Sequence, residues 1–214
     1  MKLRLLLIAG TLLCLAGCSN EGQQSNQIGL PYYRSADLTP EWISSDIESI
    51  HRIGEFSLID QDKREVSLSD LTGKIVIANF FFTQCQGICP TLTRNLSEVQ
   101  RLYDTQPDLL MLSHSVLPES DTPPVLRNYA DLHGIDGEQW RLLTGSRTAI
   151  NQVARESYLV DLDSNEPTQF LHTENVVLLD RYQRIRGVYN GSLRTDVAQL
   201  IKDIATLLGQ KPNV

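Results

Sequence analysis

Residues 75–90 have the sequence IVIANFFFTQCQGICP, and this stretch decides the fold. An almost unbroken apolar run over residues 74–82 predicts a β-strand that is buried on both faces. A helix is predicted directly afterwards, over residues 90–103, because apolar side chains recur there at helical spacing. The two cysteines in between therefore lie at the end of a buried strand, where ligands bind in open α/β sheets.

Strand-like and helix-like segments alternate on both sides of this stretch. The predicted elements are a helix at residues 41–50, a hairpin of strands at 55–59 and 65–68, a strand at 109–116, a helix at 121–132, a strand at 140–143, a helix at 146–156, a hairpin of strands at 175–180 and 184–189, and a helix capped by Thr195 that runs to about residue 208. Alternating units imply parallel strands joined by helices, and the late hairpin adds an antiparallel edge. We therefore predict an α/β fold with a thioredoxin-like central mixed sheet flanked by helices and an N-terminal β-hairpin.

The first residues of the chain differ in character from the rest. Lys2 and Arg4 precede an apolar run over residues 5–17, which is too short to cross a bilayer core of about 30 Å. The run ends in Leu15-Ala16-Gly17-Cys18, which resembles the bacterial lipobox. The resemblance implies cleavage before Cys18 and attachment of lipid to its thiol and to the new amino terminus. The alternative is an ordinary signal peptide with an incidental cysteine.

We therefore divide the chain into a lipoprotein signal peptide at residues 1–17, a flexible tether at 18–38 and a thioredoxin-like domain at 39–214. The tether is rich in Gln, Asn, Ser and Gly. The expected location is the bacterial cell envelope, with the chain anchored to a membrane by lipid and facing the periplasmic or extracytoplasmic side. Cleavage removes two basic residues and no acidic one, which takes the net charge from −7 to −9. An acidic protein of this kind argues against a nucleic-acid partner.

Cys85 and Cys89 are the two thiols that remain after cleavage and lipidation. If the loop is locally helical, positions i and i+4 place both sulfurs on one face, near a helix N-terminus that favours thiolates. Two soft thiolates suit Cu(I), and they do not complete a structural zinc site, which has four protein ligands. The alternative is a plain stabilising disulfide in an oxidising compartment.

His172 is the candidate for a third ligand, because it directly precedes an apolar strand. One imidazole and two sulfurs would form a trigonal Cu(I) site, or would hold Cu(II) with a further weak donor. Taken alone, a single histidine is more often a surface or hydrogen-bonded residue than a metal ligand. His114 lies inside an apolar strand and is expected in the core or at its rim, and Asp121-Thr122-Pro123-Pro124 indicates a helix start.

Three motifs in the same order resemble the Sco/SenC family, the copper chaperones of cytochrome c oxidase assembly. They are the cysteine loop Cys85-Gln-Gly-Ile-Cys89-Pro90-Thr91, the segment with Ser115-Val116, Pro118-Glu119 and Asp121-Thr122-Pro123, and Leu171-His172-Thr173 followed by Leu178-Leu179-Asp180 and Arg184-Ile185-Arg186-Gly187-Val188-Tyr189. The resemblance extends over about residues 53–208. It implies a thioredoxin-like fold, copper ligands at Cys85, Cys89 and His172, and a role in loading the CuA centre.

Two positions depart from the family pattern. Leu117 stands where the family usually has Asp, and Phe81 stands where many relatives have Gly. If the family carboxylate serves in docking or in tuning the metal, the change at Leu117 bears on copper affinity and on the choice of client. The three implied ligands are unaffected.

The leading hypothesis is a metallochaperone that delivers copper, as Cu(I), Cu(II) or both, through a redox-active Cys85/Cys89 pair and His172. Its partner would be the copper-bearing subunit of cytochrome c oxidase or another copper or thiol client protein. Copper release could be coupled to thiol oxidation, because a disulfide cannot serve as a dithiolate ligand. The alternatives are an extracytoplasmic thiol-disulfide oxidoreductase that reduces client cysteines, and a redox or copper sensor.

Overall fold

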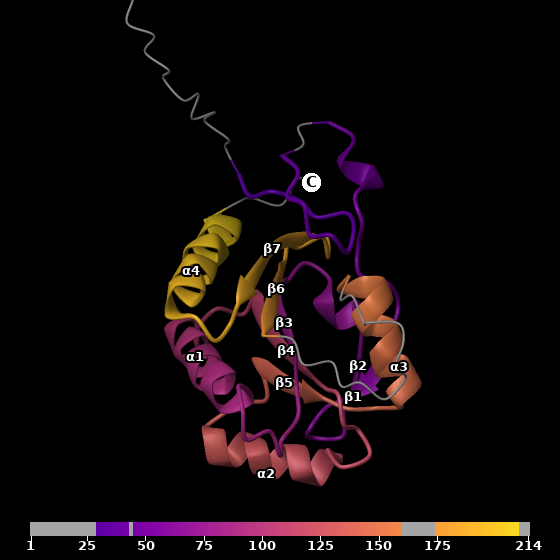
Figure 1. Cartoon of the computed structure of the whole chain (residues 1–214), viewed down its shortest axis with the longest axis vertical. Helices are drawn as coiled ribbons and strands as arrows, with labels where there is room; N and C mark the ends of the chain where they lie inside the picture. The colour runs from indigo at the N-terminus through magenta and orange to yellow at the C-terminus, as the bar shows by residue number, and fades with distance from the viewer. Residues whose placement is uncertain (1–28, 43–44, 160–173, 210–214) are drawn as a thin grey trace, which may run out of the picture.

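A five-stranded mixed sheet forms the centre of the computed structural model, which describes residues 29–42, 45–159 and 174–209 (Figure 1). The strand order is β5-β4-β3-β6-β7. β3 is parallel to β4 and β4 to β5, whereas β6 is antiparallel to both β3 and β7. The strands are β3 (Ile75–Phe81), β4 (Leu109–Ser115), β5 (Trp140–Leu143), β6 (Asn175–Leu179) and β7 (Ile185–Asn190). The predicted mixed sheet with an antiparallel edge is confirmed.

Helices cover both faces of this sheet. Figure 1 shows α1 and α4 together on one side and α3 on the other. Successive side chains of β3 alternate between the two faces, as the period of a strand requires. The helices are α1 (Cys89–Leu102), α2 (Pro123–His133), α3 (Arg147–Gln152), which continues as a π-helical turn at Val153–Ser157, and α4 (Arg194–Gly209). Each agrees with a predicted helix, except that Thr195 lies within the first turn of α4 and does not precede it.

Two hydrophobic clusters result, one on each face. The cysteine face is the cluster that contains Cys89 and packs β3 against α1, α2 and α4. The histidine face is the cluster on the other side, where Phe80 and Tyr158 enclose His114. Every residue of β3 is buried, so this strand belongs to both clusters, which is what its apolar run predicts.

The N-terminal hairpin is confirmed, but the helix predicted before it is wrong. β1 (Ser57–Ile59) pairs antiparallel with β2 (Glu65–Ser67). At the start of the predicted helix, the backbone of Glu41 pairs with that of Tyr32 in an antiparallel bridge. The Glu41 carbonyl, which would accept a hydrogen bond inside a helix, is thereby occupied, and within the described part of 41–50 only a 3-10 turn forms, at Ile47–Ser49.

The last residues of the segment predicted as a tether lie against the domain. Arg186 of β7 donates from Nε to the Pro31 carbonyl at 3.0 Å and from Nη2 to the Leu30 carbonyl at 2.6 Å. Its guanidinium also lies 3.9 Å from the centre of the Tyr32 ring. This segment therefore covers part of the outer side of β7, which is the edge strand of the sheet.

Candidate metal centre

Cys85 and Cys89 lie where β3 gives way to α1. Cys89 is the first residue of α1 and is buried in the cysteine face, with 4% of its surface exposed. Cys85 is half-buried at the edge of the same cluster. Pro90 occupies the first turn of α1, where its missing N–H costs no helical hydrogen bond. The predicted strand–loop–helix placement of both thiols is thus confirmed.

The two thiols contact each other and differ in acidity. Burial favours the neutral form of Cys85, but hydrogen bonds from the Cys89 thiol and from the backbone N–H groups of Cys89, Gly87 and Ile88 outweigh it and lower the pKa of Cys85. For Cys89, burial first and then the hydrogen bond and charge of Cys85 raise the pKa. The site therefore pairs an accessible thiol that ionises readily with a buried thiol that holds its proton.

The loop before Cys85 is fixed by a carboxylate from a distant part of the sequence. Asp121, 1% exposed, accepts hydrogen bonds from the Thr83 N–H at 3.2 Å and from the Thr83 hydroxyl at 2.6 Å. It also accepts one from the Ser115 hydroxyl at 2.5 Å. The sequence predicts a helix start at Asp121 and places it in the second family-like segment, but it assigns the carboxylate no partner; the Thr122 side chain that precedes α2 makes no capping hydrogen bond. The signal that could have found Asp121 is its place just after β4, because β3 and β4 are parallel and end at the same edge of the sheet.

Helix α2 forms one wall of the site through Tyr129. Its hydroxyl hydrogen-bonds with that of Thr93 at 2.8 Å, and its ring packs on Phe81. Burial raises the pKa of Tyr129, and the charges of Cys89 and Cys85 raise it further. Tyr129 therefore lies in the same electrostatic environment as the thiols, although no sequence motif singles it out.

Phe81 and Leu117, the two departures from the family pattern, lie in the core and in a loop respectively. Phe81 is buried in the cysteine face, against the Tyr129 ring. Leu117 lies in the loop after β4, where its N–H donates to the Ser115 hydroxyl at 3.1 Å. Leu117 therefore contributes backbone to the loop that carries Asp121, and Asp121 is the carboxylate that contacts the start of the cysteine loop.

The remaining predictions concern Cys18, His172 and His114. His172 and Cys18 are outside the described residues. Among the residues that the structure describes, no group of three or more His, Cys, Asp or Glu side chains could hold a metal ion. In the same part of the chain, no helix has the length and apolar character needed to cross a bilayer. His114 is fully buried on the histidine face, as predicted for a core histidine, with Nδ1 3.3 Å from the Asn79 carbonyl.

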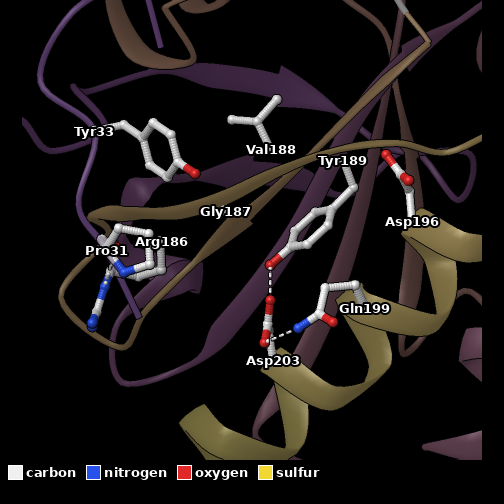
Figure 2. Close-up of a pocket in the computed structure, with 9 residues that line it drawn as sticks. All are labelled: Pro31, Tyr33, Arg186, Gly187, Val188, Tyr189, Asp196, Gln199 and Asp203. Atoms are coloured by element: carbon white, nitrogen blue, oxygen red, sulfur yellow. Dashed lines mark hydrogen bonds between the residues drawn. The ribbon is translucent and has the colours of Figure 1, made fainter. Parts of the chain in front are cut away.

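A pocket of about 300 Å³ lies apart from the cysteines, between the N-terminal segment, β7 and α4. Figure 2 shows Tyr189 and Gln199 both directed at Asp203, to which they donate hydrogen bonds of 2.7 and 2.9 Å. The strand order places β7 two strands away from β3. The pocket is therefore distinct from the cysteine site.

Comparison with known proteins identifies the family. The family model described as SCO1/SenC matches residues 45–209. The chain belongs to the SCO1/SenC family. The SCO1 protein homolog of Bacillus subtilis (strain 168) is 29% identical over 157 residues, which is 72% of this chain and 81% of that protein.

Solved structures of Sco proteins share the fold. BsSco, a member of the Sco family of cytochrome c oxidase assembly proteins in which a disulfide switch was identified, is 27% identical, with a TM-score of 0.65 over 75% of this chain and 95% of that one. Bradyrhizobium japonicum ScoI with copper bound is 25% identical, with a TM-score of 0.58 over 72% of this chain and 98% of that one. The predicted thioredoxin-like fold is thereby confirmed.

Proposed function

We propose that this SCO1/SenC protein is a copper chaperone that binds copper through Cys85, Cys89 and His172. The observation that carries the proposal is the contact between two thiols at the start of α1, one accessible and one buried. Sulfur donors are soft ligands that select Cu(I), and a neutral imidazole would complete a trigonal site. The relationship to ScoI, which is solved with copper bound, supports copper as the cargo.

The proposed client is the copper-bearing subunit of cytochrome c oxidase, at its CuA site. This part of the proposal is supported by membership of a family whose member BsSco is described as an oxidase assembly protein. Copper binding requires both cysteines as thiolates, so oxidation of the pair to a disulfide would prevent loading. The redox state of the pair would then control whether the protein can carry copper.

The proposed location follows from Cys18. Lipid on this residue would anchor the domain to a membrane of the bacterial envelope, facing the periplasmic or extracytoplasmic side. The test is to express Cys18→Ser beside the wild-type chain and to compare the membrane and soluble fractions by immunoblot. Wild type should be in the membrane fraction and the variant should not; equal membrane association of both would contradict the anchor.

Copper titration of the reduced full-length chain in detergent micelles tests the central claim. We expect Cys85→Ser and His172→Ala each to weaken Cu(I) binding by at least about 100-fold, more than is typical for changes to residues that only support a ligand. His51→Ala is the matched control, because His51 bonds the Ser157 carbonyl far from the thiols in the sequence. Copper binding that survives His172→Ala would exclude His172 as a ligand.

A second candidate function is a thiol-disulfide oxidoreductase that reduces client cysteines. The asymmetry of the pair favours it, because an accessible thiol of lowered pKa is suited to attack and a buried partner can resolve the mixed disulfide. His172→Ala separates the two functions in cells. If oxidase maturation fails while reduction of a client disulfide continues, the chaperone function is supported; if maturation continues, copper delivery through this site is wrong.

A further inference from the structure

Three carboxylates are buried in the part of the chain that the structure describes, those of Asp60, Asp121 and Asp180. Asp60 accepts from Arg64 Nε at 2.9 Å, and Asp180 accepts from Arg186 Nη1 at 3.2 Å. Asp121 forms no ion pair with any described residue; its donors are one amide and two hydroxyl groups. Burial of a carboxylate without a cation opposes folding, so its retention calls for another explanation.

Asp121 also differs from Asp60 and Asp180 in how far along the chain its hydrogen-bond partners lie. Asp60 and Asp180 each bond backbone N–H groups two and four residues further on, within their own turns. Asp121 reaches Thr83, which is 38 residues away and begins the loop that carries Cys85. Through Ser115 it also fixes the loop that follows β4. Asp121 thus joins the ends of two neighbouring parallel strands at the edge where the thiols lie.

The cysteine loop has few other fixed points before α1. Within the described residues, the backbone bonds of Thr83 and Cys85 run to Asp121 and to the Phe82 carbonyl, the latter at 3.3 Å. Gln86 and Gly87 are exposed to solvent. The position of Cys85 relative to Cys89 therefore depends on the hydrogen bonds that its sulfur accepts from Cys89, Gly87 and Ile88, and on how firmly Thr83 is held at the start of the loop.

We propose that Asp121 is a positioning residue that holds Thr83 so that Cys85 stays against Cys89, ready to bind a metal or to form a disulfide. The part of this inference that concerns copper rests on the proposed function; the part that concerns the geometry of the thiol pair does not. Both bonds to Thr83 act on a residue two positions before Cys85, so a shift there moves the sulfur directly.

The test compares Asp121→Asn and Thr83→Val with wild type in two measurements on the full-length chain. The first is Cu(I) affinity by competition with a chromophoric chelator, where we expect a loss of about 10- to 100-fold, the range for residues that orient ligands. The second is the metal-free equilibrium of the Cys85–Cys89 disulfide with glutathione, two glutathione thiols giving up two electrons as the protein disulfide becomes two thiols. A loosened loop should favour the dithiol by about tenfold, or about 30 mV for a two-electron couple.

Two further variants separate positioning from general stability. Thr83→Ser keeps both bonds to Asp121 and should restore wild-type values in both measurements. Asp180→Asn disturbs a buried carboxylate in the turn between β6 and β7, so it should lower the unfolding free energy while leaving copper affinity and the disulfide equilibrium unchanged. If Asp121→Asn does not fold, both measurements are made on Thr83→Val and Ser115→Ala instead.

The outcomes distinguish this inference from the proposed function. Wild type that binds no Cu(I) ends the chaperone proposal, and the glutathione equilibrium still decides the role of Asp121. Unchanged equilibria in Asp121→Asn and Thr83→Val would overturn the positioning role. So would an equal change in Asp180→Asn, because the effect would then follow from lost stability alone.

Discussion

Buried polar side chains on the two faces of the central sheet differ in whether they have hydrogen-bond partners. On the cysteine face, the Ser113 hydroxyl donates to Asn79 Oδ1 at 2.6 Å and accepts from Trp140 Nε1 at 2.8 Å. On the histidine face, His114 Nε2 and the Tyr158 hydroxyl have no hydrogen-bond partner among the described residues. Ser113, Asn79 and Trp140 on the face that carries the thiols are thus bonded to one another, whereas His114 and Tyr158 on the opposite face bury polar atoms without a described partner, at a cost in stability.

His114 shows that a residue type suited to metal binding need not lie at the metal site. His114 has the side chain of a metal ligand, but it is stacked on Phe80 in the opposite cluster from Cys89. Burial lowers its pKa to about 4, and the contact with the Asn79 carbonyl only partly offsets this. His114 is therefore neutral at physiological pH and acts on the stability of the fold.

The largest expected effect concerns the two thiols of the cysteine face. At pH 7, iodoacetamide should alkylate Cys85 about 100-fold or more faster than Cys89, because the reactive species is the thiolate and Cys89 is both buried and of raised pKa. Mass spectrometry of tryptic peptides from the reduced protein measures both rates. In denaturant the two rates should converge, and equal rates in the native protein would contradict the asymmetry.

The next effect is a loss of stability in mild acid that originates on the histidine face. Between about pH 6.5 and pH 4 the unfolded chain binds a proton at His114 and the folded chain does not. The contribution of neutral His114 to the unfolding free energy is fully present above pH 6.5 and is lost as the pH falls. The loss is about 2 kcal/mol between pH 7 and pH 5, and about 3 kcal/mol once the pH is below 4.

Chemical denaturation of wild type and His114→Phe at a series of pH values measures this contribution. The difference between the two unfolding free energies should change with pH over that window, since other titrating groups are common to both proteins. A difference that stays constant from pH 7 to pH 5 would show that His114 is hydrated or paired in the folded state.

The same contrast explains how far the sequence predicts this structure. Apolar runs and helical spacing predict β3, α1 and the alternation of strands and helices around them, because burial on two faces leaves a strong pattern. The helix predicted at residues 41–50 fails because Thr39-Pro40-Glu41, which has the residue types of a helix start, is only a local signal, and pairing of Glu41 with Tyr32 overrides it. Asp121 escapes prediction because its partner Thr83 is 38 residues away, and spacing within one segment carries no information about such contacts.

A smaller effect is expected from loss of a bonded hydroxyl on the cysteine face. Ser113→Ala removes the acceptor of Trp140 Nε1 and the donor to Asn79, and it leaves both groups buried. We expect the unfolding free energy to fall by about 1.5 kcal/mol, within the usual cost of stranding buried polar groups. Denaturation in urea measures the change, and Ser49→Ala, at an exposed position, serves as the control.

The smallest effect has the opposite sign and comes from the other face. Tyr158 is 1% exposed, burial raises its pKa, and its hydroxyl has no partner among the described residues. Tyr158→Phe removes that hydroxyl and keeps the ring that packs edge-on against Phe80 and His114. The unfolding free energy should therefore rise by about 1 kcal/mol. A loss of stability in Tyr158→Phe would mean that the hydroxyl is bonded in solution and that the two faces do not differ in this respect.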